Sequence, residues 1–155
     1  MNRIHIMLGG NLGNVAETFR NAQKFLEENG LKITGTSRIG SSAAVDCVPG
    51  TPDFCDQAIA GLWNGTPDEL LDLLQKTEKH FGRPPNHRSD ESRTLDCDLI
   101  FFNDLVISTL RLTVPHPRMH QRAFVLELMV ETAPDFIHPV LKKSVRELFD
   151  DIVCK

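Results

Sequence analysis

The sequence has no long apolar run, no paired-cysteine motif and no export signal. Its hydrophobic stretches fall short of the roughly 20 residues with which a helix crosses a membrane. The N-terminal segment M-N-R-I-H-I-M-L-G-G lacks the apolar core and cleavage pattern of a signal peptide. The cysteines form no C-x-x-C pair, which leaves zinc and redox motifs unsupported: they are Cys47, Cys55, Cys97 and Cys154. We therefore expect a cytoplasmic protein whose thiols are free.

An excess of positive charge is also missing. The chain carries 17 Lys and Arg against 21 Asp and Glu, a formal net charge of −4, which argues against general nucleic-acid binding. The predicted strands carry no aromatic RNA-recognition signature. The 155 residues are enough for one domain with its own core. We expect a single domain over residues 1–155 that is a monomer and binds neither nucleic acid nor a membrane.

Neither of the common glycine-rich phosphate loops is present. The early turn at residues 9–13 reads G-G-N-L-G, which differs from G-x-G-x-x-G. No Gly-Lys-Ser or Gly-Lys-Thr follows it, as a Walker loop would require. If the protein binds a nucleotide, other groups must neutralise its phosphates.

Apolar periodicity predicts six main elements in the order β-α-β-β-α-β. The strands are expected at 4–8, 31–44 with a bend at Gly35, 54–63 and 93–102, and the helices run from an N-cap at Asn14 to about Gly30 and from a capping box at Thr66 to Gly82. This order is that of the ferredoxin-like α+β fold, with an antiparallel sheet and helices packed on one face. Short C-terminal elements should follow: a strand at 105–107, an extended segment at 112–117, and helices at 123–132 and 143–153.

The predicted strand at 93–102 carries two carboxylates within an apolar stretch. Because side chains alternate along a strand, Asp96 and Asp98 should project from one face, about 6–7 Å apart. By the same alternation Thr94, Ile100 and Phe102 share that face, and the other face takes Leu95, Cys97, Leu99 and Phe101. Unpaired charge is costly in such surroundings, so a positive group should meet the two aspartates.

Arginine is concentrated around that strand and lysine is absent from it. The window 82–122 holds no lysine, and its arginines are Arg83, Arg88, Arg93, Arg111, Arg118 and Arg122. Arginine binds phosphate oxygens in a bidentate manner, and paired carboxylates suit Mg²⁺. This pattern predicts a polyphosphate site, with surface aspartates paired to arginines as the alternative. The polar segment 82–92 lacks apolar periodicity and is predicted to be a mobile lid.

Several longer segments resemble one enzyme family. The chain reads F-G-R at 81–83, R-T-L-D-C-D-L-I at 93–100, and R-L-T-V-P-H-P-R-M-H-Q-R-A-F at 111–124. These segments resemble 6-hydroxymethyl-7,8-dihydropterin pyrophosphokinase, and G-G-N-L-G-N at 9–14 is similar to an early segment of that family. The resemblance spans almost the whole chain. It implies a ferredoxin-like enzyme of folate biosynthesis that transfers pyrophosphate from ATP to the hydroxymethyl group of the pterin and releases AMP.

The resemblance also implies roles for individual residues. Asp96 and Asp98 would bind two Mg²⁺ ions that bridge the ATP phosphates, and Arg83 and Arg93 would steady the transferred group. The positions matching ATP contacts are Gln75, Glu78, Leu99, Arg111, Thr113, His116 and Arg122. The positions matching the pterin pocket are Ala43, Asp46, Phe54, Asp56 and Phe124, with Phe54 and Phe124 as the aromatic pair around the ring.

Asp56 departs from the family pattern, which usually has asparagine at this position. A pterin edge presents an amino group and a ring N–H side by side, and one carboxylate can accept from both. We hypothesise that ionised Asp56 binds a pterin-like ring. Pairing of Asp56 with an arginine, away from the substrate, is the alternative.

Three other functions fit parts of the pattern. A metallohydrolase would use Asp96, Asp98, His116 and His120 as its metal-binding set. The same ATP and Mg²⁺ site could instead serve a different pterin-like acceptor. A non-catalytic RNA-binding module on the same fold is disfavoured by the charge and by the absent aromatic signature.

Overall fold

The computed structural model describes residues 1–11, 14–42, 54–81 and 95–153. Arg83, Arg93, Ala43 and Asp46 lie outside these ranges, as does the predicted lid at 82–92, so their roles stay predictions.

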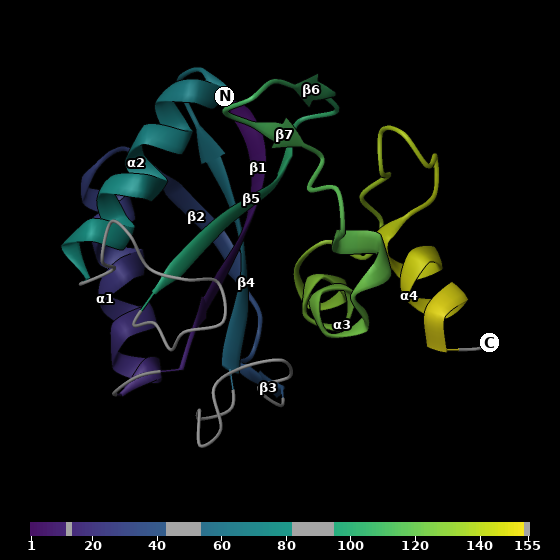
Figure 1. The fold of residues 1–155 in the computed structure, drawn as a ribbon, viewed down its shortest axis with the longest axis horizontal. Coiled ribbons are helices and arrows are strands. Elements are labelled where there is room, and N and C mark those ends of the chain that lie inside the picture. Colours follow the sequence, from purple (N-terminus) through teal and green to yellow (C-terminus); the bar gives the residue numbers. More distant parts are fainter. Residues whose placement is uncertain (12–13, 43–53, 82–94, 154–155) are drawn as a thin grey trace.

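An antiparallel sheet forms the centre of the molecule (Figure 1). Its strands follow the order β2-β4-β1-β5, with β3 paired to β4. The bounds are β1 Asn2–Gly10, β2 Lys32–Thr36, β3 Gly40–Ser42, β4 Phe54–Trp63 and β5 Asp96–Phe102. Since β1 is antiparallel to both β4 and β5, the arrangement is the ferredoxin-like one predicted from the sequence.

Two helices cover one face of this sheet, and their ends follow the predicted signals. Helix α1 (Val15–Glu28) begins after Asn14, whose side chain accepts from the N–H of Glu17. Helix α2 (Pro67–His80) begins with the predicted capping box, in which Thr66 and Glu69 exchange hydrogen bonds. Both helices pack their buried stripes against alternate residues of β1, such as Ile4 and Ile6. This layer forms the larger of the two hydrophobic cores.

The C-terminal elements cover the opposite face of the sheet. The sequence prediction placed helices on one face and did not say where these elements pack. Helix α3 (Ala123–Thr132) and helix α4 (Val145–Val153) lie on the other side of the sheet from α1 and α2 (Figure 1). They form a second core with Met7, Ala58 and Phe101. The sheet is therefore buried on both faces, which fixes which side chains of each strand point to which side.

The strand predicted at 31–44 is divided into β2 and β3. Ser37 lies between them and bonds to β4 through both its main chain and its hydroxyl, at 2.9 Å from the Ala58 oxygen and 2.9 Å from the Ala58 nitrogen. One ladder bond is thereby replaced by a side-chain bond, and the strand is interrupted. Thr34 is additionally bulged out of the β2–β4 register.

The predicted alternation along β5 is wrong beyond Leu99. In the pairing with β1, Ile6 lies opposite Leu99 and His5 opposite Phe101, so Ile100 is an extra residue. Such a bulge inverts the alternation that follows it. Phe101 therefore enters the second core, and Phe102 enters the first. Asp96 and Asp98 precede the bulge and keep their common face.

The remaining elements are shorter than predicted. Strands β6 (Ile107–Ser108) and β7 (Thr113–Val114) pair as a small hairpin, and a 3-10 turn, η1 (Met119–Gln121), leads to α3. Helix α4 starts two residues later than expected, because Ser144 caps it by exchanging hydrogen bonds with Glu147. No helix in the described ranges is both long and apolar enough to cross a membrane.

Gly61 gives a test of the packing between β4 and β2. A Cβ at this position would lie 2.8 Å from the main-chain oxygen of Lys32, closer than a real contact allows. Gly61→Ala should lower the free energy of unfolding by roughly 1–3 kcal/mol, because backbone must move. Gly35→Ala is the matched control in β2, since a Cβ there meets nothing within 4 Å. Chemical denaturation of both variants measures the difference, and equal stabilities would contradict the β2–β4 register.

Candidate functional site

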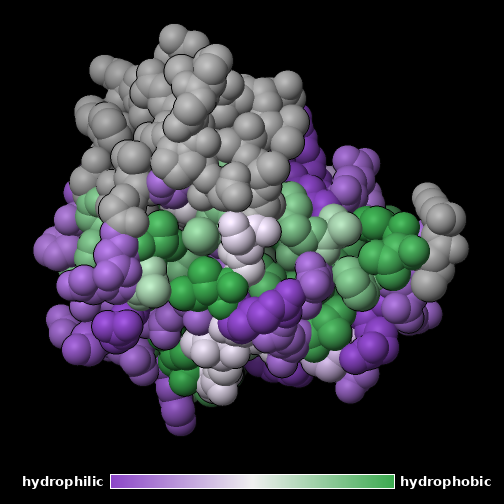
Figure 2. Space-filling model, turned by 90° about the horizontal axis from the view of Figure 1, so that it is seen from below, coloured by the Kyte–Doolittle hydropathy of each residue, from purple (hydrophilic) through white to green (hydrophobic). Residues whose placement is uncertain are grey.

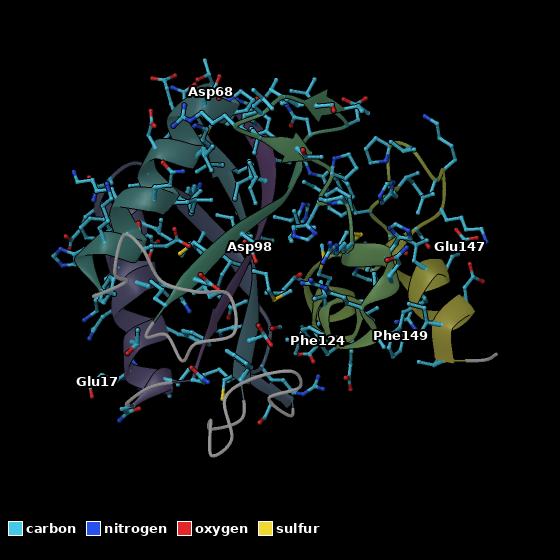
Figure 3. All side chains as sticks on the ribbon, viewed as in Figure 1. Glu17, Asp68, Asp98, Phe124, Glu147 and Phe149 are labelled. Atoms are coloured by element: carbon cyan, nitrogen blue, oxygen red, sulfur yellow. The ribbon has the colours of Figure 1, made fainter. Side chains whose placement is uncertain are left out.

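Three carboxylates share one face of the sheet at the end toward which β1 runs. Gly9 of β1 lies opposite Asp56 on β4 and opposite Asp96 on β5. Met7, two residues earlier on β1, lies opposite Asp98. Directly opposed residues point to the same face, so Asp56 joins the predicted Asp96 and Asp98 pair. Figure 3 shows Asp98 on β5 and Phe124 on α3, which faces it.

Gly9 allows this approach because it has no side chain. A Cβ at Gly9 would lie 3.0 Å from Oδ1 of Asp56 and 3.9 Å from Cβ of Asp96. Any larger residue would push into the Asp56 carboxylate. The glycine thus places two carboxylates on either side of bare backbone, and a ligand can approach that backbone closely.

The electrostatics of Asp56 reflect its acidic neighbours. The pKa of Asp56 is raised to about 6 by burial, the largest cause, together with the negative charges of Asp98 and Asp96, while the nearby positive charge of Arg122 opposes the rise. The three carboxylates therefore create a negative potential that a cation would relieve. Among the described residues, the alternative that Asp56 pairs with an arginine is represented by this electrostatic influence of Arg122.

The donor set fits Mg²⁺ shared with a phosphate ligand. Asp96 is half-buried and Asp98 is exposed, and both offer carboxylate oxygens, which Mg²⁺ prefers. The described residues contain no group of three or more His, Cys, Asp and Glu that could enclose a metal. Magnesium does not need one, since it keeps waters and takes substrate oxygens alongside one or two carboxylates.

Glu78 of α2 holds the start of β5 in place. Its side chain is 8% exposed, and its Oε2 accepts from the N–H of Cys97 at 2.9 Å. Cys97 stands between the two aspartates and is itself buried in the first core. Glu78 is therefore not an exposed helix acid. Glu78 positions the carboxylate strand, and its predicted contact with ATP stays a prediction.

A small pocket adjoins Asp56 on the α3 side of the sheet. It has a volume of about 210 Å³, and its lining residues are Arg38, Gly40, Ser41, Asp56, Phe124, Glu127 and Leu128. Gly40 of β3 lies directly opposite Asp56, so glycines flank this aspartate on both neighbouring strands. Phe124 remains 37% exposed in the first turn of α3. The structure therefore brings Asp56 and Phe124, both predicted pterin residues, to one pocket.

The other predicted aromatic residue lies close to this pocket. Phe54 begins β4, two residues before Asp56, so the two side chains share one side of the strand. It is half-buried, and the described lining of the pocket does not include it. The end of the molecule toward which β1 runs also carries a band of exposed apolar side chains, shown in green in Figure 2.

Arg38 links the far wall of the pocket to α3. Its guanidinium pairs with Glu127 at 2.8 Å and also with Glu131. Its main-chain N–H donates to Glu131 at 2.9 Å. These pairs are exposed and contribute little stability individually. They nevertheless hold the β2–β3 turn against α3, which bears Phe124.

His116 and Arg122 lie in the segment before α3, and Arg122 acts electrostatically on Asp56. The main-chain N–H of His116 donates to the main-chain oxygen of Ile100 at 3.0 Å, which ties this segment to the bulge in β5. Burial lowers the pKa of His116, and the positive charges of Arg122 and Arg118 lower it further, so the imidazole is neutral at pH 7. Arg122 thus acts electrostatically on both His116 and Asp56.

Four other predicted ATP residues are less directly placed. Arg111 pairs with Asp68 at 3.5 Å and with Asp72, both on α2, and would have to exchange these carboxylates for a phosphate. The side chain of Leu99 is in the first core, so only its backbone is available to a ligand. Gln75 on α2 and Thr113 on β7 are exposed.

The metallohydrolase alternative is not supported. The described residues do not bring Asp96, Asp98, His116 and His120 together as a metal-binding group. The Nδ1 atom of His116 already accepts from the N–H of Arg118 at 3.2 Å.

The sequence analysis missed the residues that shape the pocket but have no proposed role in binding or in the reaction. Gly9 and Gly40 matter because of their register opposite Asp56, and Arg38 because of its pairing with α3. Register and interlayer pairing leave no local motif. In the sequence, Gly9 belonged to a predicted turn and Gly40 lay within the strand predicted at 31–44, so neither position carried a signal of its role.

Comparison with known proteins identifies the family to which the sequence is similar. Residues 5–134 match the family described as 7,8-dihydro-6-hydroxymethylpterin-pyrophosphokinase. The chain is 35% identical over 148 residues to 2-amino-4-hydroxy-6-hydroxymethyldihydropteridine pyrophosphokinase of Synechocystis, covering 95% of this chain and 74% of that protein. The enzyme of the same name from Haemophilus influenzae is 30% identical, with 97% of this chain and 96% of that protein covered.

Some relatives are much longer. A folate synthesis bifunctional protein of Arabidopsis thaliana is 35% identical over 126 residues, which are 81% of this chain and 26% of that protein. The crystal structure of wild-type Plasmodium falciparum HPPK-DHPS with pteroate has a TM-score of 0.76 at 15% identity, covering 99% of this chain and 44% of that one. This structural likeness bears on the fold alone.

The raised pKa of Asp56 predicts a pH-dependent stability. Folding favours the protonated carboxyl, so ionisation of Asp56 destabilises the fold progressively as pH rises from about 4 to about 6. Asp56→Asn, which stays neutral, should be more stable than the wild type by roughly 1–3 kcal/mol at pH 7.5. The advantage should vanish below about pH 4. Urea denaturation at several pH values measures this. Asp150→Asn, an exposed change of the same charge, is the control and should show no such trend.

Proposed function

Because the chain belongs to the 7,8-dihydro-6-hydroxymethylpterin-pyrophosphokinase family, we propose that it transfers the pyrophosphoryl group of ATP to 6-hydroxymethyl-7,8-dihydropterin. The hydroxymethyl oxygen forms a bond to the β-phosphorus, the bond from that phosphorus to the α–β bridging oxygen breaks, and AMP leaves. One observation carries the proposal. Carboxylates suited to Mg²⁺ and a ring-sized pocket with Asp56 and Phe124 lie side by side on one sheet face.

The pocket of about 210 Å³ is the proposed place of the pterin ring. Phe124 offers an aromatic face for a flat heterocycle. Asp56 lies beside it and can accept hydrogen bonds from the amino group and ring N–H of the pterin edge. A bound ring with two N–H donors favours the ionised carboxylate, and so offsets the repulsion from Asp96 and Asp98.

Asp96 and Asp98 are the proposed holders of two Mg²⁺ ions together with the ATP phosphates. Magnesium supplies neutralisation of the phosphate charge in this position. The protein contributes the fixed spacing of the two carboxylates, since Glu78 anchors the main chain between them. Reactions of this type depend mainly on positioning and charge neutralisation, so a rigid strand is the relevant contribution.

Basic and polar groups complete the proposed nucleotide site. Arg122 lies near the carboxylates and can bind phosphate oxygens, and neutral His116 beside it can donate or accept a hydrogen bond without repelling Mg²⁺. Arg83 and Arg93, outside the described ranges, are proposed to steady the transferred group.

The reaction itself can be tested by its products. Protein, Mg²⁺, ATP and 6-hydroxymethyl-7,8-dihydropterin should give AMP and the pyrophosphorylated pterin in equal amounts. ADP as the product would overturn pyrophosphoryl transfer. If AMP forms only with another pterin-like acceptor, the ATP site stands and the acceptor is reassigned. The carboxylate of Asp56 is the reason to consider this alternative.

We predict that Asp96→Ala and Asp98→Ala each lose at least about a hundredfold in turnover, the scale expected when a metal ligand that stabilises the transition state is removed. Steady-state AMP formation measures this loss. Asp104→Ala removes an exposed carboxylate just after the other end of β5 and should leave turnover unchanged. A folded Asp96 or Asp98 variant with near-normal turnover would remove that residue from the metal site.

We predict that Asp56→Ala weakens pterin binding by roughly 1.5–3 kcal/mol, the scale of a hydrogen bond to a charged group. ATP binding should change little, because the pocket and the carboxylate pair use different side chains. Isothermal calorimetry with each ligand separates the two effects. Equal pterin affinity in the wild type and the variant would show that Asp56 does not meet the ring.

A further inference from the structure

The peptide group between Ser37 and Arg38 is hydrogen-bonded from both faces of the sheet. Its oxygen, which belongs to Ser37, accepts from the side-chain amide of Gln57 at 2.8 Å. Its N–H, which belongs to Arg38, donates to the carboxylate of Glu131 at 2.9 Å. The C=O and N–H of a planar trans peptide point in opposite directions, so the two bonds leave the group on opposite sides. Gln57 and Glu131 thus hold one rigid unit between them.

The two side chains that hold this peptide belong to different layers. Gln57 lies on β4, and its side-chain oxygen accepts from the side-chain amide of Gln23 on α1 at 3.0 Å. Because side chains alternate along a strand, Gln57 points toward α1 whereas its neighbour Asp56 points toward α3. Glu131 lies on α3, which covers the opposite face of the sheet from α1 (Figure 1). A chain of hydrogen bonds therefore runs from α1 through the sheet to α3.

Ser37 leaves the peptide little freedom to move. The residue is 4% exposed. Its N–H donates to the oxygen of Ala58 at 2.9 Å, and its hydroxyl accepts from the N–H of Ala58 at 2.9 Å. The hydroxyl also donates to the main-chain oxygen of Arg38 at 2.7 Å. Gln57 supplies the partner of the remaining group, the Ser37 carbonyl, and removal of a partner from a buried polar group is costly.

The segment that starts at this peptide forms one wall of the pocket beside Asp56. Its lining residues from the segment are Arg38, Gly40 and Ser41. A Cβ at Gly40 would lie 3.1 Å from Cδ2 of Leu128, so the segment already packs tightly against α3. A shift of the peptide would therefore change the distance between this wall and Asp56. The position of the wall depends on the two bonds that fix the peptide.

We propose that Gln57 is a positioning residue for the acceptor. Its side chain lies on the other face of the sheet from the pocket and does not touch the acceptor. It acts by fixing the peptide between Ser37 and Arg38, and with it the pocket wall. This role rests on the proposed transfer to a pterin. The nucleotide end should not depend on Gln57, because Glu78 of α2 anchors the strand that carries the other two carboxylates.

The test compares Gln57→Met with the matched control Gln23→Met. Both changes replace a half-buried amide of the same network by an apolar chain of similar length, but only the first removes the bond to Ser37. In Gln57→Met the KM for 6-hydroxymethyl-7,8-dihydropterin should rise about tenfold, with kcat and the KM for ATP within about twofold of the wild type, because acceptor binding alone is weakened. All three constants of Gln23→Met should stay within about twofold. AMP formation measures them.

Glu131→Ala removes the other bond of the same peptide and gives a second test. It should also raise the KM for the pterin. The double variant with Gln57→Met should raise this KM little beyond the larger single effect, because both changes release one unit. Independent contributions would instead multiply the two single increases.

Amide hydrogen exchange gives a readout that needs no ligand. Exchange of the Arg38 N–H should be at least about tenfold faster in Gln57→Met than in the wild type, because the peptide opens more often. The same amide should exchange at the wild-type rate in Gln23→Met. If Gln57→Met does not fold, Gln57→Glu takes its place, since a carboxylate still accepts from Gln23 but cannot donate to Ser37.

Four results would overturn the proposal. They are unchanged exchange at Arg38 in Gln57→Met, an unchanged KM for the pterin, an equal rise in the KM values for pterin and ATP, and multiplied effects in the double variant. Failure of the wild type to form AMP with this pterin would overturn the proposed function instead. Exchange at Arg38 would then still decide whether Gln57 holds the peptide.

Discussion

Repulsion among three carboxylates on one sheet face is the constraint on which the site depends. Asp56, Asp96 and Asp98 come from two strands that flank β1, and each would be more easily solvated elsewhere. The two hydrophobic cores keep them together, because burial of both sheet faces leaves the strands no freedom to slip by one residue. The packing energy of the cores is thereby used to concentrate negative charge at one place. A site of this kind is completed by cations or by donors from a ligand.

The sequence predicted well what local chemistry decides. The caps at Asn14 and Thr66 marked two helix starts, and the bounds of β4 and α3 agree with the predicted ones. The D-x-D face was also correct, since alternation over three residues needs no knowledge of neighbours. The predictions that failed concern features that one strand or helix acquires from its neighbours in the fold. The bulge at Ile100 arises in the pairing of β5 with β1, and no single strand encodes it.

The candidate site shows the same division. Motifs pointed to Asp96, Asp98, Asp56 and Phe124, and the structure brings these residues near one another. Motifs said nothing of the side chain that supports the carboxylates from behind. The family resemblance pointed to Glu78 only as a position matching an ATP contact, and its burial and its hydrogen bond to Cys97 are what assign it to β5. Supporting contacts join residues far apart in the chain, so tertiary structure has to supply them.

The pocket beside Asp56 is assembled from two layers, whereas the carboxylate pair belongs to a single strand. One wall of the pocket is α3, held to the β2–β3 turn by exposed ion pairs of Arg38 with Glu127 and Glu131. These links are weak and lie at the surface, so substitutions of Arg38, Glu127 or Glu131 can alter this wall of the pocket at little cost to the fold. The Asp96–Asp98 spacing would not change, because β5 is anchored to α2 on the opposite layer. In the proposed assignment, acceptor range depends on the pocket and phosphate chemistry on the carboxylate pair, so laboratory evolution could broaden the first while retaining the second.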